Sequence, residues 1–110
     1  MKRHKLYLFG HIIDVILTAD DKEYGGYSTN RGTIGLFDGL SDSLRASTLL
    51  HEVMEAGIEI QVGDQWKQHP DDEKLEFMIR LTENTFFTLA RDKRNRWLFE
   101  LLLGDLTWDG

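Results

Sequence analysis

The chain has 110 residues, with 19 acidic against 13 basic side chains and a formal charge of −6. This acidic balance excludes a protein that coats nucleic acid, because no surplus of Lys and Arg is present to neutralise phosphates. The sequence contains no cysteine, which excludes disulfides, thiolate metal sites and a cysteine nucleophile.

The first third of the chain has the composition of β-strands. Residues 6–9 and 12–17 are rich in β-branched and aromatic side chains, and they predict two strands or one long bent strand. Residues 24–29 lead through an Asn-Arg-Gly sequence, typical of a short hairpin turn, into residues 33–37. We therefore expect an N-terminal antiparallel sheet of three to four strands.

The remainder of the chain predicts helices. Ser41, Asp42 or Ser43 can cap the start of a first helix, which should run to about Ile60. A second helix should begin within residues 69–73, where a proline and three acidic residues suit a first turn, and continue to about Arg91. A charged joint then precedes a short helix at residues 97–103.

The expected fold class is therefore α+β, with a sheet followed by two long helices and a short C-terminal one. At this length we expect a single domain that spans residues 1–110. The apolar stretch at residues 6–19 is interrupted by His11 and Asp14 and is too short to span a bilayer. We expect a cytoplasmic protein without a membrane partner.

Three residues of the first predicted helix form a candidate metal centre. His51 and Glu55 would lie one turn apart and about 40° from each other around the helix axis. Both side chains could then reach one ion, which is why zinc sites use ligands at this spacing. Glu52 points further round and could take a proton from a water molecule at the site.

A zinc site with one open position needs a third protein ligand, for which the second predicted helix offers two candidates. Its apolar residues form one stripe, with Glu76 and Glu83 on the border; the stripe comprises Leu75, Met78, Ile79, Thr82, Phe86 and Leu89. Packing of this stripe against the first helix would present Glu76 to the His51/Glu55 pair. His69, near the helix start, is the alternative. About 10 Å of helix rise separates the two, so we expect one of them as a ligand and prefer Glu76.

Residues 48–56 read Thr-Leu-Leu-His-Glu-Val-Met-Glu-Ala and resemble the helix Thr-Leu-Leu-His-Glu-x-x-(His/Glu)-Ala of small phage and prophage proteins of the minimal zincin type. The strand-like segments at residues 24–27 and 33–37, Arg45, and His69 with Leu75-Glu76 are also similar to that family. The resemblance covers residues 6–92, with Glu55 in place of the more usual second His. It implies a zinc peptidase of phage or prophage origin in the host cytoplasm, with Glu52 as general base.

The expected partner is a peptide or protein. We place the strand at residues 33–37 at the edge of the sheet, where an extended peptide could add as a further strand. The substrate-binding residues would be Thr33, Ile34, Gly35 and Leu36. The alternative function is a zincin-shaped binding module without efficient chemistry, which engages a host or phage protein through its helices. The Trp-, Leu- and Phe-rich C-terminal segment could also form a homodimer contact.

Overall fold

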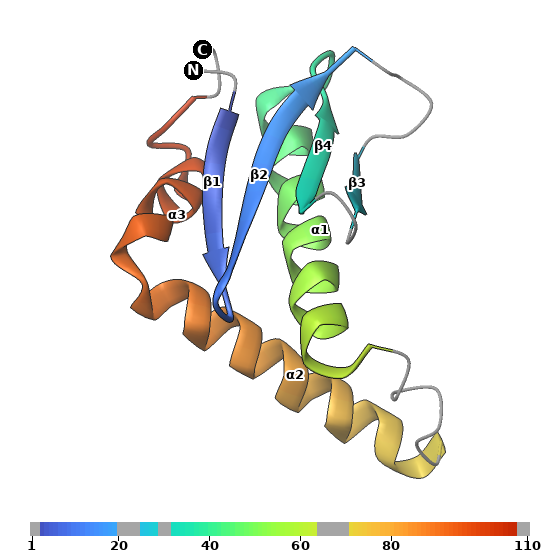
Figure 1. Cartoon of the computed structure of the whole chain (residues 1–110). Coiled ribbons are helices and arrows are strands. Elements are labelled where there is room, and N and C mark those ends of the chain that lie inside the picture. The colour runs from blue at the N-terminus through green and yellow to red at the C-terminus, as the bar shows by residue number, and fades with distance from the viewer. Residues whose placement is uncertain (1–2, 20–24, 29–31, 64–70, 108–110) are drawn as a thin grey trace.

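The computed structural model describes residues 3–19, 25–28, 32–63 and 71–107. Figure 1 shows a sheet in front of α1, with α2 crossing below it and α3 beside β1. The α+β class is confirmed, with two long helices and a short C-terminal one. The elements are β1 (Arg3–Leu8), β2 (His11–Thr18), β3 (Gly25–Ser28), β4 (Thr33–Phe37), α1 (Asp42–Val62), α2 (Asp71–Arg91), the 3₁₀ turn η2 (Lys93–Asn95) and α3 (Arg96–Leu103).

The sheet has four strands in the order β1-β2-β4-β3. β1 and β2 form an antiparallel hairpin, and β3 is antiparallel to β4. β2 and β4, however, run parallel, with Val15 opposite Ile34. The sheet is thus mixed rather than wholly antiparallel as expected. The reason is that β3 takes the outer position, so that β4 returns between β3 and β2 in the direction of β2.

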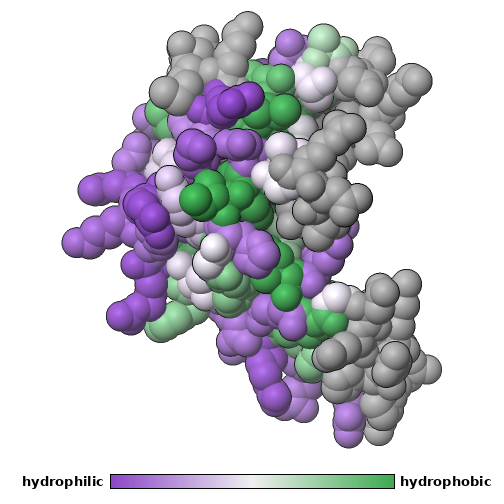
Figure 2. All heavy atoms as spheres, viewed as in Figure 1, coloured by the Kyte–Doolittle hydropathy of each residue, from purple (hydrophilic) through white to green (hydrophobic). Residues whose placement is uncertain are grey.

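One face of the sheet packs against the helices and forms the core. Alternate strand residues point to that face, as the period of two in a strand requires. The fully buried core residues are Leu6, Leu8, Ile13, Val15, Ile34, Leu36, Leu49, Val53, Ala56, Leu89 and Leu98. The opposite side of the sheet faces the viewer in Figure 2, where hydrophobic residues run through the middle of the view.

The outer edge of β1 is closed by side chains from the segment that precedes and begins α3. Asn95 is fully buried; its Nδ2 donates to the Tyr7 carbonyl at 2.7 Å, and its Oδ1 accepts from the Tyr7 amide at 2.8 Å. The indole Nε1 of Trp97 donates to the Lys5 carbonyl at 2.8 Å. These bonds satisfy backbone groups that an edge strand would otherwise offer to another chain.

The C-terminal helix α3 packs mainly into the core. Leu98 and Leu101 are buried in the core, whereas Leu103 is exposed. Homodimerisation through this segment stays a prediction, and Trp108 lies outside the described residues. In the part of the chain that the structure describes, none of the helices combines the length and apolar character needed to cross a membrane.

Candidate metal centre

α1 is held firmly at its first turn. Ser41 caps it as predicted, with its Oγ accepting from the Leu44 amide at 3.3 Å. The buried guanidinium of Arg45 donates to the carbonyls of Asp38 and Leu40 at 2.9 and 3.2 Å. These bonds tie the loop after β4 to the start of α1, the helix that carries the candidate centre.

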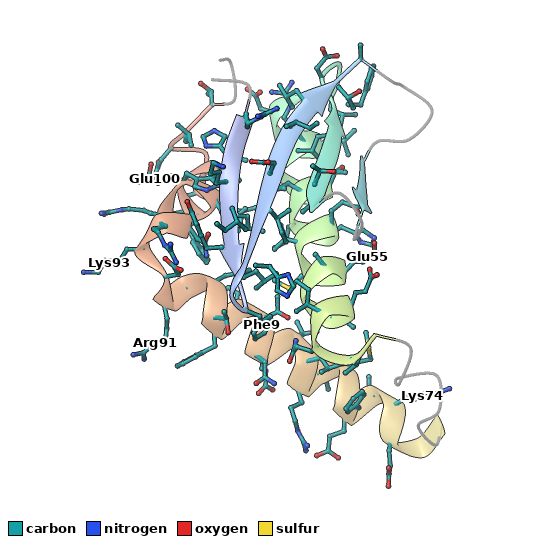
Figure 3. All side chains as sticks on the ribbon, in the orientation of Figure 1. Phe9, Glu55, Lys74, Arg91, Lys93 and Glu100 are labelled. Atoms are coloured by element: carbon teal, nitrogen blue, oxygen red, sulfur yellow. The ribbon has the colours of Figure 1, made fainter. Side chains whose placement is uncertain are left out.

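His51, Glu52 and Glu55 form one compact group on α1. Their ligand atoms, one per residue, all lie within 4.8 Å of one another. Nε2 of His51 lies 3.0 Å from Oε1 of Glu55, and both side chains are exposed. Figure 3 shows Glu55 projecting from α1 into solvent. The predicted i, i+4 pair is therefore brought together on an accessible flank of the helix.

The spacing of the His51 and Glu55 ligand atoms is compatible with a shared zinc ion. With Zn–N and Zn–O distances of about 2.0–2.1 Å, two ligands of a tetrahedral site lie about 3.3 Å apart. The 3.0 Å separation of the His51 and Glu55 atoms needs only a slight opening to reach this value. A cation would also relieve the mutual repulsion of the Glu52 and Glu55 carboxylates.

Glu52 occupies a different place from the one expected. The sequence predicts a position further round the helix from the apolar stripe, but the residue is only 8% exposed. It lies on the buried face of α1 together with Leu49, Val53 and Ala56. The spacing of Leu49, Glu52, Val53 and Ala56 follows the helical repeat, and this signal could have identified Glu52 as part of the inward face.

The structure does not bring Glu76 to the group on α1. Within the described residues, the ligand atoms that gather are those of His51, Glu52 and Glu55, and Glu76 is not among them. Its side chain is 84% exposed and lies 4.0 Å from that of Arg80, in a shallow surface pocket on α2 with Glu73 and Phe77. His69, the other candidate, lies outside the described residues.

The physical reason is that α2 packs through another face. Its buried residues in the described part are Leu81, Thr85 and Leu89, whereas Leu75, Ile79 and Phe86 of the predicted stripe are exposed. A border residue of the predicted stripe therefore faces solvent rather than α1.

Gly57 and Gln61 of α1 determine which face of α2 is buried. A Cβ at Gly57 would collide with the side chain of Thr85, so only glycine permits this approach. The Gln61 amide nitrogen donates to the carbonyl of Leu81 at 2.9 Å and to Oγ1 of Thr85 at 3.0 Å. Asn84 in turn donates to Oε1 of Gln61. Apolar periodicity alone gives no signal for this polar contact between the helices.

The predicted edge position of β4 is also wrong. β4 is paired with β2 on one side and with β3 on the other, so its backbone is not free to bind a peptide. Ile34 and Leu36 are fully buried, and Thr33 and Gly35 are half-buried. In the described part of the chain the unpaired edge next to β4 belongs to β3, and α1 packs against both strands.

Comparisons of the chain with family models, with curated proteins and with solved structures found no match. The resemblance to minimal zincins is therefore a hypothesis, and the functional conclusion depends on the geometry of the group on α1.

Proposed function

We propose that the chain binds one divalent transition metal ion, zinc by preference, through His51 and Glu55 and hydrolyses peptide bonds at this centre. The observation that carries the proposal is the gathering of an imidazole and two carboxylates within 4.8 Å on one helix. Two of these side chains are open to solvent and one is buried, so the group combines accessible ligands with a fixed carboxylate.

The three residues would divide the chemistry among them. When bound, zinc would polarise a substrate carbonyl and lower the pKa of a nearby water molecule. Glu52 would remove a proton from that water and deliver it to the leaving amine, as a general base and then a general acid. Because Glu52 is held in the buried face of α1, its carboxylate needs little reorganisation to act. His69 remains the candidate for a third ligand.

The sheet supports an extended peptide as the substrate. β3 presents the edge beside β4, and α1, which carries the group, packs against β3. A peptide that adds to this edge would make main-chain hydrogen bonds and run past α1.

Two variants test the proposal on protein purified without chelators or a metal-affinity tag. We expect about one equivalent of a divalent metal and hydrolysis of an unstructured protein such as casein. Glu52→Gln should retain the metal and abolish hydrolysis, because it removes the base and preserves the size of the side chain. Glu59→Gln, an exposed α1 carboxylate outside the group, is the matched control and should be fully active. A wild-type protein that binds no metal when zinc is added, or a Glu52→Gln variant that remains active, would refute the proposal.

A binding module is the second candidate, and one observation favours it. Several large apolar side chains of α2 are exposed, which is typical of surfaces that contact another molecule.

A further inference from the structure

One side of α2 carries a regular apolar line whose large side chains are exposed in the part of the chain that the structure describes. Leu75, Ile79, Thr82 and Phe86, named here the α2 seam, follow each other at intervals of four, three and four residues. This is the a/d spacing by which one helix packs along another. The three large apolar members are 73%, 50% and 53% exposed, in chain order.

The α2 seam is distinct from the face through which α2 joins the fold. At about 100° per residue, its mean direction lies about 90° around the helix from that of Leu81, Thr85 and Leu89, the residues that are buried. At its far end Phe86 makes an edge-on contact with Phe99 of α3, with ring centroids 5.9 Å apart. The seam therefore begins on the projecting end of α2 and ends against α3.

The flank of the seam is acidic. Glu76 and Glu83 each follow a d residue of the seam, lie seven residues apart and are exposed. These are e positions, the ones that form charge pairs with a partner helix. Among the described residues, the ion pair of Glu76 is a long contact of 4.0 Å with Arg80. Glu83 has no salt bridge within the described residues.

We propose that the α2 seam is a docking surface for an amphipathic helix of a basic partner protein. Apolar side chains of the partner would cover the seam, and its Lys or Arg residues would pair with Glu76 and Glu83. The chain's net charge of −6 would favour the approach of such a partner. The surface belongs to α2 and does not depend on the metal centre of α1.

Charge also decides between this partner and a second copy of the chain. If α2 paired with itself in antiparallel fashion, Leu75 would lie opposite Phe86 of the other copy and Ile79 opposite Thr82. The same register would bring Glu76 of each copy beside Glu83 of the other on one flank of the pair, and like charges at such positions are destabilising. A basic helix meets no such repulsion.

A pair of synthetic peptides tests the proposal with the full chain. Both peptides span three heptads with Leu at a and d; one carries Lys at e and g, and its twin carries Glu there. We expect the Lys peptide to bind, with an affinity that falls as salt is raised. The Glu peptide should bind on the order of 10-fold more weakly or not at all. Fluorescence anisotropy measures both affinities. Absence of binding by the Lys peptide, or equal binding of the two, would overturn the proposal.

Two variants of α2 locate the binding surface. Ile79→Asp places a charge in the seam and should abolish binding of the Lys peptide. Phe87→Asp removes a similarly exposed apolar side chain, 61% exposed, from a position outside the seam and should leave the affinity unchanged. Circular dichroism checks that both variants keep the fold. Equal effects of the two variants would overturn the assignment. A wild-type dimer that is detected by light scattering and dissociated by Ile79→Asp would also overturn the assignment. The seam would then contact a second copy of the chain.

Discussion

α1 and α2 are each 21 residues long, yet they meet the rest of the molecule in different ways. α1 is buried along most of its length, from Arg45 to Gly57, against the sheet. In the described part of α2 the buried residues begin only at Leu81, in the middle of the helix, and Leu75 and Ile79 before it are open to solvent.

The difference shows that small and polar residues decide which helix face is buried when two faces compete. The more apolar line of α2 contains Leu75, Ile79 and Phe86, but the buried line has Thr85 at its centre. Gly57 allows Thr85 to approach α1 closely, and Gln61 satisfies the polar groups at the contact. Hydrophobic periodicity detects both lines without ranking them.

The largest expected effect on stability comes from comparing a residue of the buried line of α2 with a residue of its exposed line. Leu89→Ala removes a fully buried side chain and should lower the free energy of unfolding by about 2–5 kcal/mol. Leu75→Ala, on the open line, should change it by less than about 0.5 kcal/mol. Urea denaturation of the two variants measures the contrast, and equal losses would show that the exposed line is also packed.

A second substitution tests the close approach of α1 and α2. Gly57→Ala places a Cβ against the side chain of Thr85 and should cost about 1–3 kcal/mol through overpacking. The double variant Gly57→Ala/Thr85→Ala removes the two closest Thr85 atoms and should recover part of this loss. A double-mutant cycle by thermal or urea unfolding measures the coupling, and strictly additive effects would argue against the contact.

A more modest loss of stability is expected from the polar contact between the helices. Gln61→Ala removes the amide that donates to the Leu81 carbonyl and to Thr85, and we expect a loss of about 1–2 kcal/mol. Gln61→Glu keeps the size but replaces the donor with an acceptor, and it should be at least as destabilising. An unchanged unfolding midpoint for both variants would mean that Gln61 does not hold α2.

The sequence predicted the elements well because local signals mark them. Ser41 caps α1 and Arg91 ends α2 as expected, and both boundaries depend on neighbouring residues alone. The parallel pairing of β2 with β4 could not be predicted, since it depends on β3 taking the outer position in the sheet. The capping of β1 by Asn95 joins residues 88 positions apart and likewise has no local signal.

The candidate site likewise combines a feature that depends on neighbouring residues with one that depends on distant ones. His51 and Glu55 lie together because the geometry of one helix places them so. The prediction for Glu76 depended on how two helices pack, and that packing is set by Gly57 and Gln61. The proximity of two side chains within one helix was therefore predictable, whereas their placement relative to a residue of the second helix was not.

Zinc titration by calorimetry on three proteins tests the central claim that α1, and not Glu76 of α2, carries the ligands. The wild-type chain should bind about one equivalent. His51→Ala should lose affinity by at least about 100-fold, the upper range for loss of an outer-sphere partner. Glu76→Ala should bind as the wild type does, because its carboxylate lies outside the group on α1. Absence of zinc binding by the wild type, or a Glu76→Ala variant as impaired as His51→Ala, would contradict the account.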